Sequence, residues 1–301
     1  MVETEDVRWP IAQRFEFIEW RVYWTGRVNR KDLETQFQIS TPQASIDLRD
    51  YQQAAQGNIT YDASEKAYVA AHNFRPAFLQ LSPERYLLQL QAMEAGAIRK
   101  RDTWFDAIPP AEVAPTIVRG PEAYTLRALV QAVETRSAID IYYQSLSRTG
   151  MRTICPHAFV NDGYRWHCRA FSIDRSEFRD YVLGRILSIS PLKPCDVDSS
   201  DDVEWTTYIQ LRIKAHPELD ARQREAIEHD YRMEDGELRL RMRLAAAFYF
   251  VKRYNLDLQD KGIDPARIQL WLDNLDELNA AMKSAKDRSR MLVAQRSTSA
   301  P

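Results

Sequence analysis

The chain has 301 residues, of which 45% are hydrophobic and 28% are charged, and its formal net charge at pH 7 is -2. This composition is typical of soluble globular proteins, and the length allows two or three domains that each bury a hydrophobic core. The charge balance excludes a protein that binds polyanions over its whole surface, so any nucleic-acid contact must come from local patches.

The first 80 residues are predicted to form a winged helix-turn-helix. Its first helix spans residues 11–24, where Ile11, Phe15, Ile18 and Val22 form one apolar stripe. Two short helices joined by a tight turn are expected within residues 26–51. Two short strands, at residues 59–61 and 66–70, would then supply the wing.

The two central helices carry capping and spacing signals. Asn29 can cap the first, and Leu33 and Phe37 lie four residues apart on its buried face. Ser40 or Thr41 can cap the second, whose first turn contains a proline. An ordinary helical hairpin would carry the same local signals, and it is the wing that favours DNA binding.

Polar and basic side chains surround these helices. Short polar side chains near the start of the second helix suit the reading of base edges in the major groove. Their neighbours, and residues of the wing, suit contacts with backbone phosphates. The residues expected to contact DNA are Arg27, Arg30, Lys31, Ser40, Thr41, Gln43, Ser45, Arg49, Asn58 and Lys66.

Residues 81–119 are predicted to be a helical linker. A helix is expected over residues 84–101, with its apolar side chains facing either the N-terminal core or a dimer partner. Pro109, Pro110 and Pro115 then favour an extended connector. This is the clearest domain boundary in the sequence.

Residues 120–193 are predicted to form one helix, at residues 121–136, followed by a small β-domain. From residue 138 the apolar pattern alternates, and turn residues separate short strands. The expected strands are residues 139–145, 151–155, 157–160, 164–171 and 178–189, the last interrupted at Gly184. Strands this short and close together indicate a small barrel or a strongly bent sheet.

One strand of this domain carries an unusual set of side chains. Alternation places Arg165, His167 and Arg169 on one face of the strand at residues 164–171. No lysine occurs between Lys100 and Lys193, so the fixed cations of this domain are arginines, which suit bidentate phosphate contacts. The pattern predicts an anion site. In the alternative interpretation the face is solvated and its arginines pair with neighbouring carboxylates, namely Asp162, Asp174, Glu177 and Asp180.

A second linker, acidic over residues 196–204, leads to a smaller α+β unit at residues 203–286. The elements expected there are strands at residues 205–215 and 268–271, helices at 218–230, 245–254 and 274–285, and a hairpin near Asp235. Residues 287–301 are polar and are expected to be a disordered tail. The whole chain is therefore predicted to be a multidomain α+β protein.

Residues 163–170, GYRWHCRA, resemble the central motif of a WYL domain, a ligand-sensing module of bacterial transcription regulators. The family takes its name from the triplet Trp-Tyr-Leu. Trp166 matches its first position, and His167 and Cys168 stand where the family has Tyr and Leu. The longer strings QSLSR, ICPHAFVNDGYRWHCRAF and FRDYVLGRI, with NRKDLETQFQIS and YDASEKAY nearer the N-terminus, resemble the BrxR and CapW family of repressors. These repressors are associated with the BREX and CBASS antiphage systems, and the resemblance covers residues 10–285.

This resemblance implies a homodimer whose winged helices bind an inverted repeat upstream of a defence operon. It also implies that an SH3-like or Sm-like barrel, the WYL domain, senses a nucleic acid or nucleotide, and that the C-terminal extension dimerises. The sensing residues carried over are Tyr143, Ser145, Ser147, Arg152, His157, His167, Arg169, Arg179 and Arg185.

An enzyme acting on nucleic acid is the main alternative class. It would need a metal-binding carboxylate cluster or a nucleophile beside a base. Ser145 with His157 or His167 is the pair that the sequence offers. A zinc site is disfavoured, because His167 and Cys168 point to opposite faces of one strand and the spacing is not that of zinc ligands. We therefore expect no catalytic residue, no metal and no cofactor.

The three cysteines, Cys155, Cys168 and Cys195, are too few and too irregularly spaced for a disulfide framework. Such usage fits a reducing compartment. The sequence also has no signal peptide and no apolar run of 18 residues. We therefore expect a cytoplasmic protein with no membrane partner.

Overall fold

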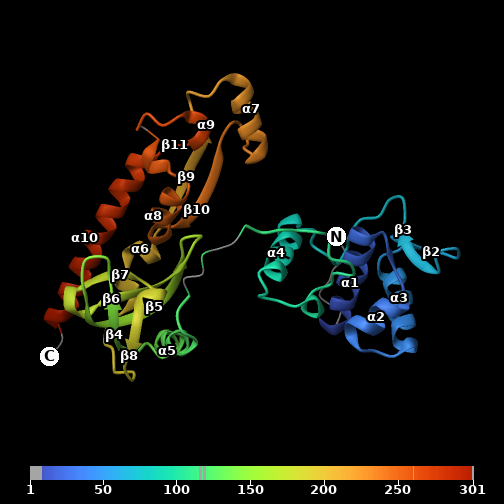
Figure 1. Ribbon diagram of the computed structural model, residues 1–301, viewed down its shortest axis with the longest axis horizontal. Coiled ribbons are helices and arrows are strands. Elements are labelled where there is room, and N and C mark those ends of the chain that lie inside the picture. Colours follow the sequence, from blue (N-terminus) through green and yellow to red (C-terminus); the bar gives the residue numbers. More distant parts are fainter. Residues whose placement is uncertain (1–8, 115–116, 118–119, 260, 300–301) are drawn as a thin grey trace. The chain divides into compact units, whose positions relative to one another are not determined.

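A computed structural model describes residues 9–114, 117, 120–259 and 261–299 of the chain. The chain divides into two compact units, Met1–Pro115 and Thr116–Pro301. The first contains the helices and wing of the N-terminal domain, and the second contains a five-stranded sheet and the C-terminal extension (Figure 1).

The N-terminal unit has three helices and a small antiparallel sheet. The helices are α1 (Trp9–Thr25), α2 (Arg30–Phe37) and α3 (Thr41–Ala54), and the strands are β1 (Arg27–Val28), β2 (Ile59–Asp62) and β3 (Ala67–Ala70), in the order β1-β3-β2. Both predicted caps are present, because Asn29 accepts a hydrogen bond from the backbone N–H of Asp32 and Ser40 from that of Gln43. Gln38, between the two helices, has a left-handed φ of 54°, which makes the turn tight.

A buried carboxylate organises the core of this unit. Glu19, in α1, accepts hydrogen bonds from the backbone N–H groups of Ala77, Phe78 and Leu79 at 2.7, 2.9 and 2.6 Å. It also accepts one from the Tyr51 hydroxyl of α3 at 3.0 Å. Burial, and secondly the charge of Glu19, raises the pKa of Tyr51 well above its ordinary value. Glu19 therefore joins α1, α3 and the segment that follows the wing.

The helix after the wing, α4 (Pro83–Glu94), is shorter than the predicted 84–101. It ends ahead of Gly96, which has a positive φ of 69°, and a 3-10 turn at Lys100–Asp102 follows. Tyr86 of α4 stacks on Trp20 of α1 with ring centroids 5.9 Å apart, so the helix packs on the N-terminal unit. Leu87 and Leu88 remain exposed on its other face.

The C-terminal unit begins with α5 (Ala123–Glu134) and an antiparallel sheet. Its strands are β4 (Ile139–Gln144), β5 (Thr149–Asn161), β6 (Trp166–Ser172), β7 (Glu177–Val182) and β8 (Ile186–Ile189), in the order β7-β6-β5-β4-β8. The two predicted strands 151–155 and 157–160 are one strand, β5, with a register shift between Pro156 and Ala158. The predicted strand 178–189 is two strands, because a 3-10 turn at Leu183–Arg185 separates β7 from β8, which pairs with β4 instead.

The C-terminal extension is a second α+β layer. Its elements are α6 (Val203–Thr206), β9 (Tyr208–Ala215), α7 (Ala221–Asp230), β10 (Leu238–Arg243), α8 (Leu244–Arg253), α9 (Pro265–Ile268), β11 (Leu270–Leu272) and α10 (Leu275–Ser299), with the sheet order β10-β9-β11. In Figure 1, α10 runs from the β11 end of the extension back to the five-stranded sheet.

The predicted disordered tail at 287–301 is wrong for residues 287–299, which continue α10; residues 300 and 301 lie outside the described residues. This second half of α10 is held by tertiary contacts. Arg290 lies 3.3 Å from Glu177 of β7, and Arg296 lies 2.8 Å from Asp198 in the connector after β8. No described helix is long and apolar enough to cross a membrane.

Candidate functional site

A hollow of about 510 Å³ lies where α2, the start of α3 and the wing meet. Arg30, Lys31 and Lys66 line it, and among the described residues none of these three cations forms an ion pair. Glu34 is the carboxylate in its lining. The hollow is therefore cationic, although the chain as a whole is nearly neutral. Unpaired cations on α2 and on the wing turn suit an extended polyanion.

The structure separates the predicted DNA-contact residues into those that line the hollow and those that do not. Five of them line the hollow, namely Arg30, Lys31, Thr41, Ser45 and Lys66. Ser40 caps α3, and Gln43 donates a hydrogen bond to Asp47 at 2.9 Å, which holds its amide against its own helix. Arg27 pairs with Glu65 at 2.9 Å across the wing, and Arg49 pairs with Asp50 at 3.3 Å.

Asn58 is not a phosphate contact, which corrects the prediction. Its side chain is buried, with 8% of the residue exposed. The amide donates to the Tyr51 hydroxyl at 3.1 Å and to the Arg75 carbonyl at 2.7 Å, and it accepts from the Arg75 N–H at 3.1 Å. Because its amide is hydrogen-bonded within the protein, Asn58 holds the start of the wing against Tyr51 and Arg75.

Two aromatic residues of the hollow, Tyr61 and Tyr68, are not among the predicted DNA-contact residues. Tyr61 of β2 and Tyr68 of β3 line it and contact each other edge to face, with ring centroids 5.2 Å apart. Tyr61 is 57% exposed. Both belong to the predicted wing strands, and their cross-strand pairing places them on the same side as the cations.

The C-terminal unit contains a buried ion cluster centred on Arg169 of β6. Its guanidinium contacts Asp202 at 2.6 and 2.8 Å, Glu204 at 2.9 Å and Asp180 at 3.3 Å. Only 3% of Arg169 is exposed, and Asp202 is completely buried. Burial alone would lower the pKa of Arg169, but the hydrogen bond with Asp202 and the charges of the three carboxylates outweigh it and raise the pKa.

Two predicted ligand-binding histidines lie beside this cluster. His157 Nε2 lies 2.9 Å from Asp202 Oδ2, and the His167 ring stacks on Tyr249 of α8 with centroids 4.6 Å apart. The Tyr249 hydroxyl donates to Asp180 at 2.9 Å. Burial lowers the pKa of His167 despite the nearby carboxylates and so favours the neutral ring. The extension therefore covers this face of β6, and Arg169, predicted there as part of an anion site, pairs with carboxylates of the protein.

The other predicted ligand residues lie on several elements of the sheet and its turns. Tyr143 is buried in the core of the sheet, where its hydroxyl accepts a hydrogen bond from the Val182 N–H at 3.1 Å, so its prediction as a ligand contact is wrong. Ser145 donates to the Arg148 carbonyl at 2.7 Å within the β4–β5 turn, which also contains Ser147. Three arginines remain at least partly accessible on separate elements, namely Arg152 on β5, Arg179 on β7 and Arg185 in the turn before β8.

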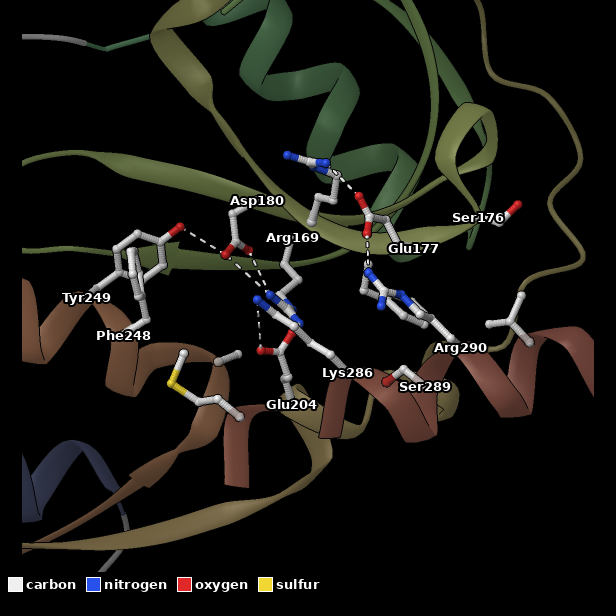
Figure 2. Close-up of a pocket in the computed structure, with 15 residues that line it drawn as sticks. Arg169, Ser176, Glu177, Asp180, Glu204, Phe248, Tyr249, Lys286, Ser289 and Arg290 are labelled. Carbon is white, nitrogen blue, oxygen red and sulfur yellow. Dashed lines mark hydrogen bonds and ion pairs between the residues drawn. The ribbon is translucent and has the colours of Figure 1, made fainter. Parts of the chain in front are cut away.

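A cavity of about 320 Å³ lies between the five-stranded sheet and the extension, and Figure 2 shows the residues that line it. Two of the predicted ligand residues, Arg169 and Arg179, contribute to it from β6 and β7. Lys286 and Arg290 of α10, which lie outside the predicted sensing set, also line the cavity, together with Phe248 of α8. The cavity is thus assembled from both parts of the unit.

Glu177 bridges two cations at the edge of this cavity. It lies 2.6 Å from Arg179 on its own strand and 3.3 Å from Arg290 on α10. Lys286 lies 4.0 Å from Glu204 on the inner side. Arg179 and Arg290 share the carboxylate of Glu177, and Arg290 also lies 3.7 Å from Asp287 on its own helix, whereas Arg169 contacts three carboxylates.

The nucleophile and base of an enzyme are not brought together. Among the described residues, the Ser145 hydroxyl is bonded within its turn, and neither His157 nor His167 bonds to it. The described residues also hold no group of three or more His, Cys, Asp or Glu placed to bind a metal ion. Cys155 and Cys195 form one disulfide, a pairing that the spacing of the three cysteines does not predict.

Three family models match successive parts of the chain. They are the BrxR transcriptional regulator winged helix-turn-helix domain at residues 10–92, the WYL domain at residues 124–191, and the BrxR C-terminal dimerization domain at residues 208–278. The predicted order of winged helix, WYL domain and C-terminal extension is confirmed.

Curated relatives match nearly the whole chain. The DNA-binding transcriptional repressor CapW of Escherichia coli (strain KTE188) is 35% identical over 281 residues, covering 93% of this chain and 94% of its own length. The chain belongs to the CapW family of transcriptional repressors. CapW of Stenotrophomonas maltophilia is 34% identical over 289 residues, covering 94% and 96%, and CapW of Pseudomonas aeruginosa is 33% identical over 276 residues, covering 91% and 92%.

Family membership confirms the resemblance seen in the sequence and the prediction that the chain is not an enzyme. In this CapW-family chain the cationic hollow lies in the matched winged helix, and the Arg169 cluster joins the WYL domain to a segment just ahead of the matched dimerization domain. A solved structure, the proteasome accessory factor B/C of Arthrobacter aurescens, matches 91% of this chain and 46% of that chain at 16% identity, with a TM-score of 0.28 that is too low to inform the fold.

Proposed function

We propose that this CapW-family protein is a cytoplasmic, homodimeric repressor that binds an inverted repeat and controls a bacterial antiphage defence operon. Its WYL domain senses a nucleic acid or nucleotide, which changes its affinity for the operator. The cationic hollow of the winged helix is the observation that carries the DNA-binding part of this proposal. The match to a dimerization domain supports the homodimer.

The hollow has the arrangement that duplex DNA requires. Arg30 and Lys31 stand at the start of α2 and Lys66 in the wing turn, so cations lie on both sides of the first turn of α3. Thr41 and Ser45 occupy that turn. Phosphate contacts supply affinity and orientation, while short polar side chains at a helix N-terminus can reach base edges. The Ser45 hydroxyl donates its hydrogen to the Thr41 carbonyl at 2.9 Å. While it keeps this bond, its oxygen can only accept a hydrogen bond from a base.

The salt dependence of binding tests the phosphate contacts. The probes are a duplex carrying the DNA upstream of the coding sequence and a shuffled duplex of equal length. We expect Arg30→Ala and Lys66→Ala to weaken binding to both, and to make the slope of log K against log salt shallower by about 1 each. Arg222→Ala on α7 removes an exposed arginine outside the winged helix and should leave the slope unchanged.

Sequence preference tests the reading of bases. Thr41→Ala and Ser45→Ala should reduce the ratio of upstream to shuffled affinity while keeping the salt slope, since these side chains carry no charge. Gln43→Ala should have a smaller effect, because its amide is held by Asp47. An equal loss on both duplexes for Thr41→Ala and Ser45→Ala would count against base reading.

The cavity between the WYL domain and the extension is the site that best suits the ligand. Arg179 and Arg290 share Glu177 at its edge, and a phosphate can take the place of that carboxylate. Phe248, which is 46% exposed, offers an aromatic face on which a base can stack. An occupant would touch both parts of the unit, so its binding would depend on how they are arranged.

Release of DNA by short oligonucleotides tests this sensing role. We expect Arg290→Ala to keep the operator affinity of the wild type without ligand and to lose its response to a panel of single-stranded DNA and RNA tetranucleotides. Arg288→Ala, two residues earlier on the same helix and outside the cavity, is the matched control. A normal response in Arg290→Ala would remove the cavity from the proposal, and a wild type that responds to none of the panel would remove the oligonucleotide ligand.

A further inference from the structure

Two cysteines that are 40 residues apart in the sequence meet at the edge of the WYL domain. Cys155 lies in β5, and Cys195 lies in the connector that leads from β8 to the extension. Their Cα atoms are 6.4 Å apart and their sulfur atoms are bonded. That Cα separation is within the range that disulfides span without moving the backbone. No part of the proposed DNA-binding or sensing role uses either cysteine.

The pair lies among side chains from three parts of the unit. Cys155 belongs to a buried cluster with Phe171 and Phe178 of the sheet, and Cys195 packs against that cluster together with Val293 of α10. The connector then continues to Asp202, which pairs with Arg169. A bond at Cys195 therefore fastens the connector to the sheet close to the point where the extension is anchored.

The third cysteine, Cys168, differs from Cys195 in its exposure. Cys168 is completely buried, and burial raises the pKa of its thiol well above the ordinary value. A thiol held in its protonated form in an apolar core is a poor nucleophile. Cys195, by contrast, is half-buried in the connector and can meet a small oxidant.

We propose that Cys155 and Cys195 form a redox-responsive modification site whose oxidant is a hydroperoxide. The Cys195 thiol releases its proton, and the thiolate attacks one oxygen of hydrogen peroxide; the O–O bond breaks, the sulfenic acid forms, and the departing hydroxide takes up that proton and leaves as water. The Cys155 thiol then releases its proton, and its thiolate attacks the sulfenic sulfur; the S–S bond forms, the S–O bond breaks, and the departing hydroxide takes up this second proton and leaves as water. Two thiols are oxidised to one disulfide while one hydrogen peroxide is reduced to two waters.

The consequence is a covalent link between the sheet and the connector that depends on redox conditions. Disulfides in reducing compartments are uncommon, and those that occur are mostly transient or redox-sensing. Reduction leaves the connector attached by its ion pairs, which include Lys193 with Asp140 and Arg296 with Asp198. Oxidation adds a restraint that closes a 40-residue loop.

Thiol counting on the full chain tests the site. The protein is reduced, freed of reductant and treated with a small excess of hydrogen peroxide, and its free cysteines are then alkylated under denaturing conditions and counted by mass spectrometry. We expect three alkylated cysteines before oxidation and one afterwards, with Cys155 and Cys195 linked in a single peptide pair. Cys168→Ser should form the same link, and Cys195→Ser should form none. Peroxide-treated wild type with three free thiols, or with a link through Cys168, would overturn the proposal.

Equilibration in glutathione buffers separates a responsive site from a permanent structural bond. We expect the linked fraction to change from below a tenth to above nine tenths across buffers that run from mostly reduced to mostly oxidised glutathione. The linked form should melt roughly 8 to 15 °C above the reduced form, since loop closure restricts the unfolded chain. Cys195→Ser should melt at one temperature in all buffers. A bond that stays complete in reduced glutathione, or never forms in oxidised glutathione, would refute the redox response.

Discussion

Replacing Arg169 by methionine isolates the ion cluster between the WYL domain and the extension. Methionine keeps an unbranched side chain of similar length but removes the contacts to Asp180, Asp202 and Glu204. Asp202, which is completely buried, would then keep the His157 ring and the backbone N–H of Trp205 as partners. The variant leaves three carboxylates close together without their shared cation.

The expected cost is large because the carboxylates cannot return to water without moving the connector. Removing one partner of a buried ion pair typically costs about 3–5 kcal/mol. For a unit of this size each kcal/mol lowers the melting temperature by roughly 2–4 °C, so we expect a fall of roughly 6–20 °C. The loss should appear in the C-terminal unit, where the cluster lies.

Calorimetry of the full chain at several pH values measures this effect. Burial alone would raise the pKa of Asp202, but the hydrogen bonds from Arg169 and His157 outweigh it, and the folded-state pKa lies below the ordinary 3.8. A depressed carboxyl pKa stabilises the fold fully above its unfolded value and loses that contribution as the pH falls through the folded value. The difference between wild type and Arg169→Met should therefore be greatest near pH 7 and shrink below about pH 4.

Arg165→Met is the matched control, since Arg165 directly precedes β6, is partly exposed, and among the described residues forms one ion pair, with Asp162 at 3.2 Å. We expect it to cost less than about 1 kcal/mol. If Arg169→Met melted within the range of this control, or if its deficit did not change with pH, the cluster would not be the stabilising element described above.

Three other substitutions test the remaining assignments. Glu19→Ala should destabilise the N-terminal unit by about 3 kcal/mol or more, measured by urea unfolding, because three buried backbone N–H groups lose their acceptor. Asn58→Ala should cost about 1–3 kcal/mol by the same assay and leave the salt slope of DNA binding unchanged; a shallower slope would restore Asn58 as a phosphate contact. Tyr143→Phe should lower the melting temperature by a few degrees, roughly what one buried hydrogen bond contributes, without altering release by oligonucleotides, and a lost response would return Tyr143 to the ligand site.

Local signals predicted the DNA-binding half well. The caps at Asn29 and Ser40 act within one turn of their own helices, so they can be read from neighbouring residues and are present in the structure. The wing strands likewise follow from short apolar runs around a polar turn. The local sequence does not show which of the polar residues face the hollow. The sequence alone predicts Asn58 as a surface residue, because its partners, Tyr51 and Arg75, become its neighbours only in the folded unit.

In the C-terminal unit, the sequence predicted the faces of the strands but not what packs against them. Alternation along β6 correctly separated Arg169 and His167 from Cys168, since side chains alternate between the faces of a strand. It could not show what covers each face. The acidic segment predicted as a second linker provides Asp202 and Glu204, which pair with Arg169 in the interior.

The sequence by itself determined the order of the domains, the helices and wing that suit DNA, and the family, because these depend on short-range patterns and on strings of matching residues. Only the tertiary structure decided that α10 continues to Ser299, that Cys155 meets Cys195, and that the arginine of β6 is buried. Each of these depends on segments distant in the chain that become neighbours after folding. Burial and charge pairing belong to that arrangement, and no local pattern encodes them.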